Sequence, residues 1–386
     1  MTKTVSAYST AKDSTVAAVD LIAQLRAVLP NPDAVIVFLS AKYSFDAILS
    51  ELTSAFPDAK IVGCSSAGEF DETGSGEGAA SAFGISSPDM SFSASIATDL
   101  SGDVEAAAKT LLAGFRGFDE NRYRYRSALI LNDALAGSAD ELVRALHLET
   151  GGKYKFFGGG AGDDAAFTKT FVFKGKEVAT NAAIALEILS SKPLGVGVRH
   201  GWTPATDAMR VTSSDANVVE SLDATSTAEV FQNHAETTGQ HLDCTAPLPF
   251  FLHNIAGMKQ DDGYKLRVPL AMRDDGGVVF AAEIPEGSAV SIMSASVDSS
   301  MAAAKHAAED AMRQLGESKP AGVLFFDCVA TRLRLGKEFG KEIETVRTAV
   351  GDVALAGCNT YGQVASAEGE FAGFHNCNAV VCVFPE

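Results

Sequence analysis

Hydrophobic positions near the start of the chain follow two spacings, one typical of helices and one typical of buried strands. Apolar residues recur near a period of 3.6 after Asp13, a residue type that caps helices. They are Val16, Val19, Ile22, Ala23 and Leu25. The run 34–39 is continuously apolar and rich in β-branched residues, which predicts a strand buried on both faces. Alternation of such helices and strands along the chain predicts an α/β fold.

The same order of elements occurs three times. Helices are expected after Asp13, Asp103 and Asp298, and each is followed by a strand, a second helix and further strands. We therefore predict repeated αβαββ units with mainly parallel pairing of their strands. The predicted repeats span residues 13–90, 103–190 and 298–384.

Residues 205–297 do not follow this order. Short alternating runs such as 209–212 and 277–282, with a turn at Asp274-Asp275-Gly276, predict an antiparallel sheet. We therefore expect an α+β segment before the third repeat. The predicted domains are an N-terminal part, 1–204, with two repeats, and a C-terminal part, 205–386, made of segment 205–297 and the third repeat 298–386.

Each predicted repeat also contains a glycine-rich turn after a short apolar run. Glycine at the end of a strand permits a positive φ or a close approach of another backbone or a ligand. We expect the three turns to converge, and the main pocket to be lined by at least two turn side chains and one from residues 200–270. The turns read Val62-Gly63-Cys64-Ser65-Ser66-Ala67-Gly68-Glu69, Gly158-Gly159-Gly160-Ala161-Gly162-Asp163 and Ala356-Gly357-Cys358-Asn359-Thr360-Tyr361-Gly362-Gln363.

The predicted ligand-binding residues come from these turns. Asp163 and Asp164 oppose a phosphate and are better suited to accept backbone N–H groups or an amino group, so a structural turn is the default expectation there. The pocket prediction concerns Cys64, Ser65, Asp163, Cys358, Asn359 and Tyr361. The full predicted set is Gly63, Cys64, Ser65, Ser66, Gly160, Asp163, Gly357, Cys358, Asn359 and Tyr361.

Charge and composition narrow the classes of partner. The formal net charge of −18 argues against binding to nucleic acid or to an anionic membrane surface. No apolar run approaches 18 residues and the N-terminus opens no apolar signal segment, so we expect a cytoplasmic protein. The six cysteines include no Cys-x-x-Cys pair and are expected to be reduced. The oligomeric state is left open, a homo-oligomer included.

The glycine turns and two further stretches resemble the FIST sensory domain, in its N-terminal and C-terminal parts, over nearly the whole chain. The further stretches are Val219-Glu220-Ser221-Leu222-Asp223 and Ile284-Pro285-Glu286-Gly287-Ser288. The resemblance implies a bacterial or archaeal input domain of signal transduction that binds a small ligand. Free-standing members of this length include haem-containing nitric-oxide sensors that act beside a separate histidine kinase. We therefore expect a stand-alone, non-enzymatic sensor that binds haem b and modulates such a kinase.

A haem site needs an axial donor in an apolar pocket. We expect that donor to be His200, which would hold the haem iron as the sole metal, with His253 and His375 as alternatives. Arg267 lies within a predicted strand and is expected either at its solvent face or paired with a haem propionate.

Two other functions remain open. One is a sensor of an amino acid or another small metabolite. The other is a thiol-dependent hydrolase or transferase that uses Cys64 or Cys358. No histidine lies in either of those turns to act as the base, so we expect no catalysis.

Overall fold

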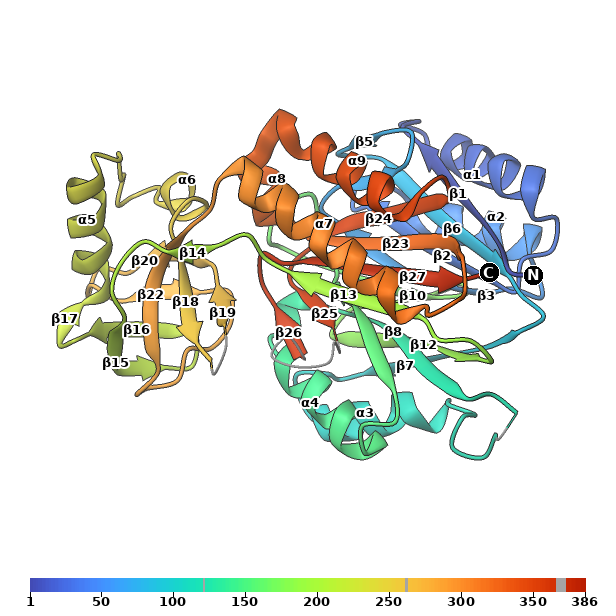
Figure 1. Ribbon diagram of the computed structural model, residues 1–386, viewed down its shortest axis with the longest axis horizontal. Helices are drawn as coiled ribbons and strands as arrows, with labels where there is room; N and C mark the ends of the chain where they lie inside the picture. Colours follow the sequence, from blue (N-terminus) through green and yellow to red (C-terminus); the bar gives the residue numbers. More distant parts are fainter. Residues whose placement is uncertain (121, 261–262, 366–372) are drawn as a thin grey trace.

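A computed structural model shows a chain with two parts of unequal size (Figure 1). It describes residues 1–120, 122–260, 263–365 and 373–386. The larger part, the three-sheet body, contains both termini and three six-stranded sheets with helices outside them. The smaller part, the inserted domain, contains a sheet of nine described strands between residues 203 and 294.

The first sheet is built from the N-terminal segment and one hairpin of the second segment. Its strand order is β1-β6-β2-β3-β10-β11. Helices α1 and α2 pack on the face that carries Val35, Val37 and Leu39. The elements are β1 (Lys3–Ser9), α1 (Ser14–Val28), β2 (Ala34–Ser40), α2 (Phe45–Ala55), β3 (Lys60–Ser66), β6 (Ala80–Ser86), β10 (Val172–Lys174) and β11 (Glu177–Ala179).

The second sheet is built from the next segment and one hairpin of the third segment. Its order is β26-β25-β9-β8-β12-β7, and helices α3 and α4 pack on its outer face. The elements are β7 (Met90–Thr98), α3 (Val104–Ala113), β8 (Tyr125–Asn132), η1 (Ala134–Ala136), α4 (Ala139–Thr150), β9 (Lys155–Gly160), β12 (Ala182–Ser190), β25 (Gln363–Ala365) and β26 (Gly373–His375).

The third sheet is built from the last segment and one hairpin of the first. Its order is β13-β27-β23-β24-β4-β5, and helices α7, α8 and α9 lie on its outer side. The elements are β4 (Glu69–Asp71), β5 (Ser75–Gly76), β13 (Gly195–Arg199), α7 (Val297–Gln314), β23 (Pro320–Cys328), α8 (Val329–Leu335), η2 (Gly336–Glu338), α9 (Phe339–Val350), β24 (Ala354–Thr360) and β27 (Ala379–Pro385).

The mixed α/β class is as expected, but the expectation of mainly parallel pairing is wrong. Among the described strands of the body, only β2–β3, β8–β9 and β23–β24 pair in parallel. The last long strand of each segment (β6, β12 or β27) runs antiparallel beside the second strand, and it separates that strand from the first. Each segment also begins with a strand, β1, β7 or β13, which the expected αβαββ unit lacks.

The three sheets exchange short hairpins. The β4–β5 hairpin of the first segment pairs with β24, the β10–β11 hairpin of the second pairs with β3, and the β25–β26 hairpin of the third pairs with β9. Every sheet is therefore completed by a hairpin from another segment. Strands as short as β4 and β5 do not show a period of two, so the sequence pattern does not predict them.

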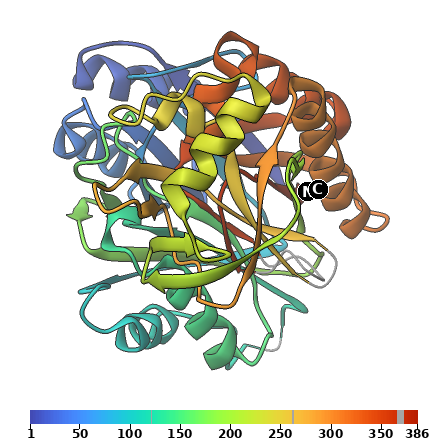
Figure 2. The ribbon, with the colours of Figure 1, turned by 90° about the vertical axis from the view of Figure 1, so that its left-hand side faces the viewer.

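The inner faces of the three sheets share one central core. Ile36, Leu131 and Leu324 come from different sheets and are fully buried in the same apolar cluster. Figure 2, viewed through the inserted domain, shows the helices of the three segments spread around this core. The strands are buried on both faces, which explains their continuous apolar runs.

The inserted domain has the antiparallel sheet expected from the sequence, since every described pair in it is antiparallel. It follows β13, so it lies inside the third segment rather than before it. Its elements are β14 (Thr203–Pro204), β15 (Met209–Asp215), β16 (Val218–Leu222), β17 (Thr225–Ser226), α5 (Thr227–Thr238), α6 (Leu248–Phe251), β18 (Ile255–Lys259), β19 (Tyr264–Arg267), β20 (Pro269–Met272), β21 (Val278–Phe280) and β22 (Ala289–Ser294).

Candidate ligand site

The three glycine turns converge as expected, but they converge on one another. The first turn bonds to the third through Ala67 N and Asn359 O, 2.9 Å apart. The second turn bonds to the first through Gly162 N and Ser65 O, also 2.9 Å apart. The second and third turns are joined by Gly160 N and Gly362 O at 2.9 Å and by Tyr361 N and Gly160 O at 3.0 Å. The turns form a closed ring of backbone hydrogen bonds.

Glycine is required where each strand enters this ring. A Cβ atom at Gly63 would lie 1.9 Å from Val37 O, and one at Gly357 would lie 2.0 Å from Phe325 O. The corresponding distance at Gly158 is 2.1 Å, to Ile130 O. In each case the glycine and the residue that carries the carbonyl are register partners in a parallel pair of strands, so the close approach follows from the strand register.

Most of the predicted turn residues are inside the protein rather than on a cleft. Cys64 and Cys358 belong to the central core, and Ser65, Ser66 and Asn359 are also buried. Burial raises the pKa of the Cys358 thiol well above its usual value, which opposes a reactive thiolate there.

Asp163 stabilises its own loop. Its carboxylate accepts hydrogen bonds from the backbone N–H groups of Phe167, Thr168 and Lys169 and from the hydroxyl of Tyr361. Burial alone would raise the pKa of Asp163, but these hydrogen bonds together lower it. Asp163 therefore holds a structural turn, which is the default expectation for this stretch.

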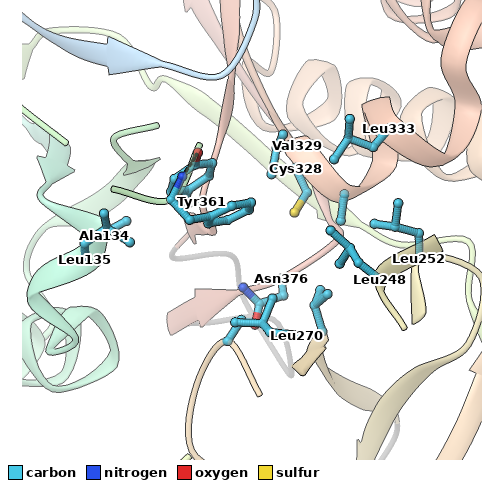
Figure 3. Close-up of a pocket in the computed structure, with 14 residues that line it drawn as sticks. Ala134, Leu135, Leu248, Leu252, Leu270, Cys328, Val329, Leu333, Tyr361 and Asn376 are labelled. Atoms are coloured by element: carbon cyan, nitrogen blue, oxygen red, sulfur yellow. Dashed lines mark hydrogen bonds between the residues drawn. The ribbon is translucent and has the colours of Figure 1, made fainter. Parts of the chain in front are cut away.

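A cavity lies where the three-sheet body meets the inserted domain (Figure 3). It has a volume of about 90 Å³, and its walls are mainly aliphatic and aromatic. The rings of Phe167 and Tyr361 stack on one wall at 4.4 Å between centroids. The lining residues are Ala134, Leu135, Phe167, Cys328, Val329, Ala330, Leu333, Tyr361 and Asn376 from the body, with Leu248, Leu252, Val268, Leu270 and Ala281 from the inserted domain.

The junction location agrees with the sequence prediction, but the predicted lining does not. Tyr361 is the sole member of the six predicted turn residues that lines this cavity, although inserted-domain side chains do contribute. The other five lie in or behind the ring because the turns bond to each other. The cavity is instead bordered by α8 and by the segment after β26, neither of which carries a recognisable motif.

Two polar side chains of this cavity were missed from the sequence. Asn376 is 2% exposed, and its Oδ1 has no hydrogen-bond partner among the described residues. Cys328 is 3% exposed and accepts a hydrogen bond at its sulfur from the thiol of Cys377. That hydrogen bond lowers the pKa of Cys328 to about 7. Figure 3 shows Cys328 and Asn376 on walls of the same cavity, facing the space beside Tyr361.

A group of buried charges lies behind Cys328. Asp327 and Glu342 are 1% and 2% exposed, and burial raises the pKa of both carboxyls, that of Glu342 to about 7. They hydrogen-bond to each other, which requires a shared proton. The guanidinium of Arg334 lies 5.0 Å from the ring centroid of Trp202 and donates to Ser300 Oγ at 2.6 Å.

The predicted histidine donors do not line the cavity. His200 Nε2 lies 3.2 Å from Tyr264 O, and burial lowers the pKa of this histidine. Burial likewise lowers the pKa of His253, while His375 is buried in β26. None of the three is among the residues around the cavity in the part of the chain that the structure describes.

Arg267 is a structural residue that joins the two parts. It is 1% exposed, its Nη2 lies 3.1 Å from Asp140 Oδ2 on α4, and its Nε donates to Glu283 O at 3.0 Å. Lys265 lies 2.6 Å from the same carboxylate oxygen. The solvent-facing position expected for Arg267 is wrong, and its guanidinium is already paired.

The junction cavity does not fit a haem. An engineered apolar cavity of about 150 Å³ holds benzene, so a space of about 90 Å³ is far too small for a porphyrin. No histidine among the described residues lines it to serve as the axial donor. No group of three or more His, Cys, Asp or Glu residues suited to a metal ion occurs among the described residues either.

Comparison with known families places this geometry in context. The FIST N domain family matches residues 33–225 and the FIST C domain family matches residues 228–366. FIST domains are linked to the sensing of small ligands in signal transduction. The chain belongs to the FIST family.

Other comparisons add little. No curated protein matches the chain. The solved structures include a cyanuric acid hydrolase from A. caulinodans, at 8% identity, with 100% of this chain and 99% of that chain covered and a TM-score of 0.34. They also include T. maritima PurL complexed with ATP, at 11% identity, 100% and 71% coverage and a TM-score of 0.23. Among the described residues, no helix is long and apolar enough to span a membrane.

Proposed function

We propose that this protein is a sensor that binds a small neutral organic molecule, of about the size of benzene or smaller, in the junction cavity. The observation that carries the proposal is a mainly apolar cavity with one buried amide oxygen, Asn376 Oδ1, that has no partner among the described residues. A buried acceptor without a donor costs free energy, so a ligand with a hydroxyl or N–H group would recover it. Aliphatic walls would hold the rest of the ligand.

Signalling would follow from the position of the cavity. Leu252 and Leu270 belong to the inserted domain, whereas Leu333 and Tyr361 belong to the body, so a ligand would contact both parts at once. A ligand shifts an equilibrium between two arrangements when it binds one of them better. The receiver in this proposal is a separate signalling protein, and a histidine kinase is the kind that the FIST resemblance implies.

An amino acid is the second candidate ligand. Its ammonium and carboxylate groups would each need a charged or strongly polar partner. Among the described residues, the side chains that line the cavity offer one amide, one thiol and one hydroxyl, and that hydroxyl already donates to Asp163. The mainly apolar lining therefore favours a neutral ligand over a zwitterion.

Ligand binding is tested by titration with phenol and tert-butanol, with glycine and haemin as comparison probes. We expect phenol to raise the melting temperature and to change the fluorescence of Trp202, the single tryptophan, which lies beside the cavity wall in one cluster with Cys328. Ala281→Trp should fill the mouth of the cavity and remove the effect. Ala271→Trp is the matched control, because Ala271 is exposed on the neighbouring strand and does not line the cavity.

Two results would contradict the proposal. One is stabilisation by haemin or glycine with no response to phenol or tert-butanol. The other is an equal response to phenol in the Ala281→Trp and Ala271→Trp variants.

A further inference from the structure

Cys328 and Cys377 form a thiol pair at the cavity wall, which ligand binding alone does not require. The two thiols are hydrogen-bonded to each other although 48 residues separate them in the sequence. Both are free and nearly fully buried. Only Cys328 lines the junction cavity, whereas Cys377 lies behind it, beside Arg334 and Asp327.

The surroundings of the pair distinguish the roles of the two sulfurs. Cys328 lines the cavity whereas Cys377 does not, and the hydrogen bond between the two thiols lowers the pKa of Cys328. A thiolate is the reactive form of cysteine. Cys328 is therefore suited to react with a molecule in the cavity, and Cys377 to attack the product from behind.

We propose that Cys328 and Cys377 form a redox-active dithiol that reduces a small alkyl hydroperoxide bound in the junction cavity. The proposal rests on that cavity being the ligand site. Its aliphatic walls suit the alkyl group, and the free Asn376 Oδ1 suits the hydroperoxide O–H as donor. A hydroperoxide of four carbons has the same number of non-hydrogen atoms as benzene.

The reaction balances in two steps. The Cys328 thiolate attacks the terminal oxygen of the hydroperoxide, the O–O bond breaks, and the leaving alkoxide takes a proton to become the alcohol. Cys328 is then a sulfenic acid. The sulfur of Cys377 attacks that of Cys328, an S–S bond forms, and the oxygen leaves as water. An external thiol reductant returns the pair to two thiols by exchange.

Closure of this disulfide would act on the element that borders the cavity. Cys328 immediately precedes α8, and Val329, Ala330 and Leu333 of that helix line the cavity. Cys377 follows β26 with a φ of 56°. A covalent bond between them would tie α8 to the β26–β27 turn, so oxidation would change the wall that contacts the inserted domain.

The test uses the full chain with Cys244→Ser, which removes the one exposed thiol. This protein is treated with tert-butyl hydroperoxide and analysed by intact mass and non-reducing peptide mapping. We expect a loss of two hydrogens and a cross-link between the peptides of Cys328 and Cys377. Adding Cys377→Ser should stop the reaction at a sulfenic acid on Cys328, which dimedone traps. Adding Ala281→Trp should slow it at least tenfold, while Ala271→Trp should not.

The proposal is overturned if no cross-link between Cys328 and Cys377 forms, or if Ala281→Trp reacts as fast as Ala271→Trp. Phenol binding is measured in parallel on the Cys244→Ser protein. If that protein still binds phenol but forms no cross-link with the hydroperoxide, the dithiol proposal fails while the ligand site stands. Loss of phenol binding in every protein, with the cross-link still formed, would contradict the proposed ligand site instead.

Discussion

Individual glycines in the ring of turns are required because a side chain would clash with a neighbouring strand. At Gly63 the missing Cβ would meet a carbonyl oxygen at 1.9 Å, whereas Gly340 in α9 has nothing within 4 Å. Gly63→Ala should therefore destabilise the chain by at least about 2 kcal/mol, because the backbone must move apart. Gly340→Ala should stabilise it by roughly 0.4–1 kcal/mol. Urea unfolding measures both, and equal effects would show that the close approach at Gly63 is relaxed in solution.

The sequence indicated which glycines are required, but not which backbone carbonyl groups approach them. Gly63 and Gly357 could be recognised from their place after apolar runs. The residue opposite each depends on strand register, which spacing alone does not determine. Cys328 and Asn376 could not be recognised at all, because their importance comes from residues that are distant in sequence.

Glu69 is a second residue whose role depends on burial. Its side chain is fully buried, accepts from Ser66 Oγ at 2.5 Å and from Ala79 N at 3.0 Å, and burial raises its pKa to about 8. The folded state therefore keeps a proton that the unfolded state loses near pH 4.5. The contribution of Glu69 to the free energy of unfolding is therefore full below pH 4.5, falls as the pH rises, and is lost above about pH 8.

Glu69→Gln should remove this pH dependence. Between pH 4.5 and 8 the stability of the wild type relative to the variant should fall by up to about 1.4 kcal/mol per pH unit. Urea unfolding of both proteins at several pH values measures the difference. A constant difference across this range would mean that Glu69 is ionised in the folded protein.

At the scale of elements, the hairpin exchange makes each sheet depend on another segment. Phe70 of β4 is fully buried in the third segment, 5.5 Å from the ring of Phe325 and 5.7 Å from that of Phe339. Phe70→Ala should cost about 3–5 kcal/mol, since it leaves a cavity in that core. Leu148→Ala, at a side chain that is 75% exposed, should change stability by less than about 0.5 kcal/mol.

The measurement also reports on cooperativity. Far-UV circular dichroism follows the whole chain, and fluorescence follows Trp202 at the junction with the inserted domain. If the exchanged hairpins join the segments, Phe70→Ala should shift both urea transitions together. A shift of one transition alone would show that the third segment unfolds independently.

Local sequence patterns predicted individual helices and strands better than they predicted which strands pair with each other. Asp13 and Asp103 cap α1 and α3 as expected, but α7 is capped by Ser296 rather than beginning at Asp298. The strand–helix alternation predicted that the helix-connected strands run the same way. It did not predict that the last long strand of each segment would separate the first two, because nothing local specifies which strand a chain pairs with.

At the scale of the whole molecule, the inserted domain is joined to the body by a shared carboxylate. Asp140 on α4 pairs with Lys265 and Arg267 of β19. Burial alone would raise the pKa of Asp140, but the two cations together lower it. Such a group stabilises the fold above its unfolded pKa, and the contribution is lost as the pH falls through the lower folded pKa.

The sequence could predict an antiparallel segment and a pocket at its junction. It could not predict the walls of that pocket, because they depend on how α8 and the segment after β26 face the inserted domain. Arg267 illustrates the limit. An arginine between Leu266 and Val268 is expected to face solvent, and only the position of Asp140, more than 100 residues earlier, explains its burial.

Asp140→Asn should loosen the inserted domain without unfolding it. The change removes the negative charge that pairs with the buried Arg267, which keeps neutral acceptors such as the carbonyl oxygens of Leu266 and Glu283. Because the Asp140 side chain is 43% exposed, we expect a moderate loss of about 1–2 kcal/mol. Hydrogen exchange should become faster at the amides of β19 and β20, while α1 and α2 of the body stay unchanged. Glu309→Gln breaks an exposed i,i+4 pair with Lys305 and should leave all of these rates within error. Uniformly faster exchange over the whole chain in Asp140→Asn would show that the carboxylate stabilises the global fold rather than the junction.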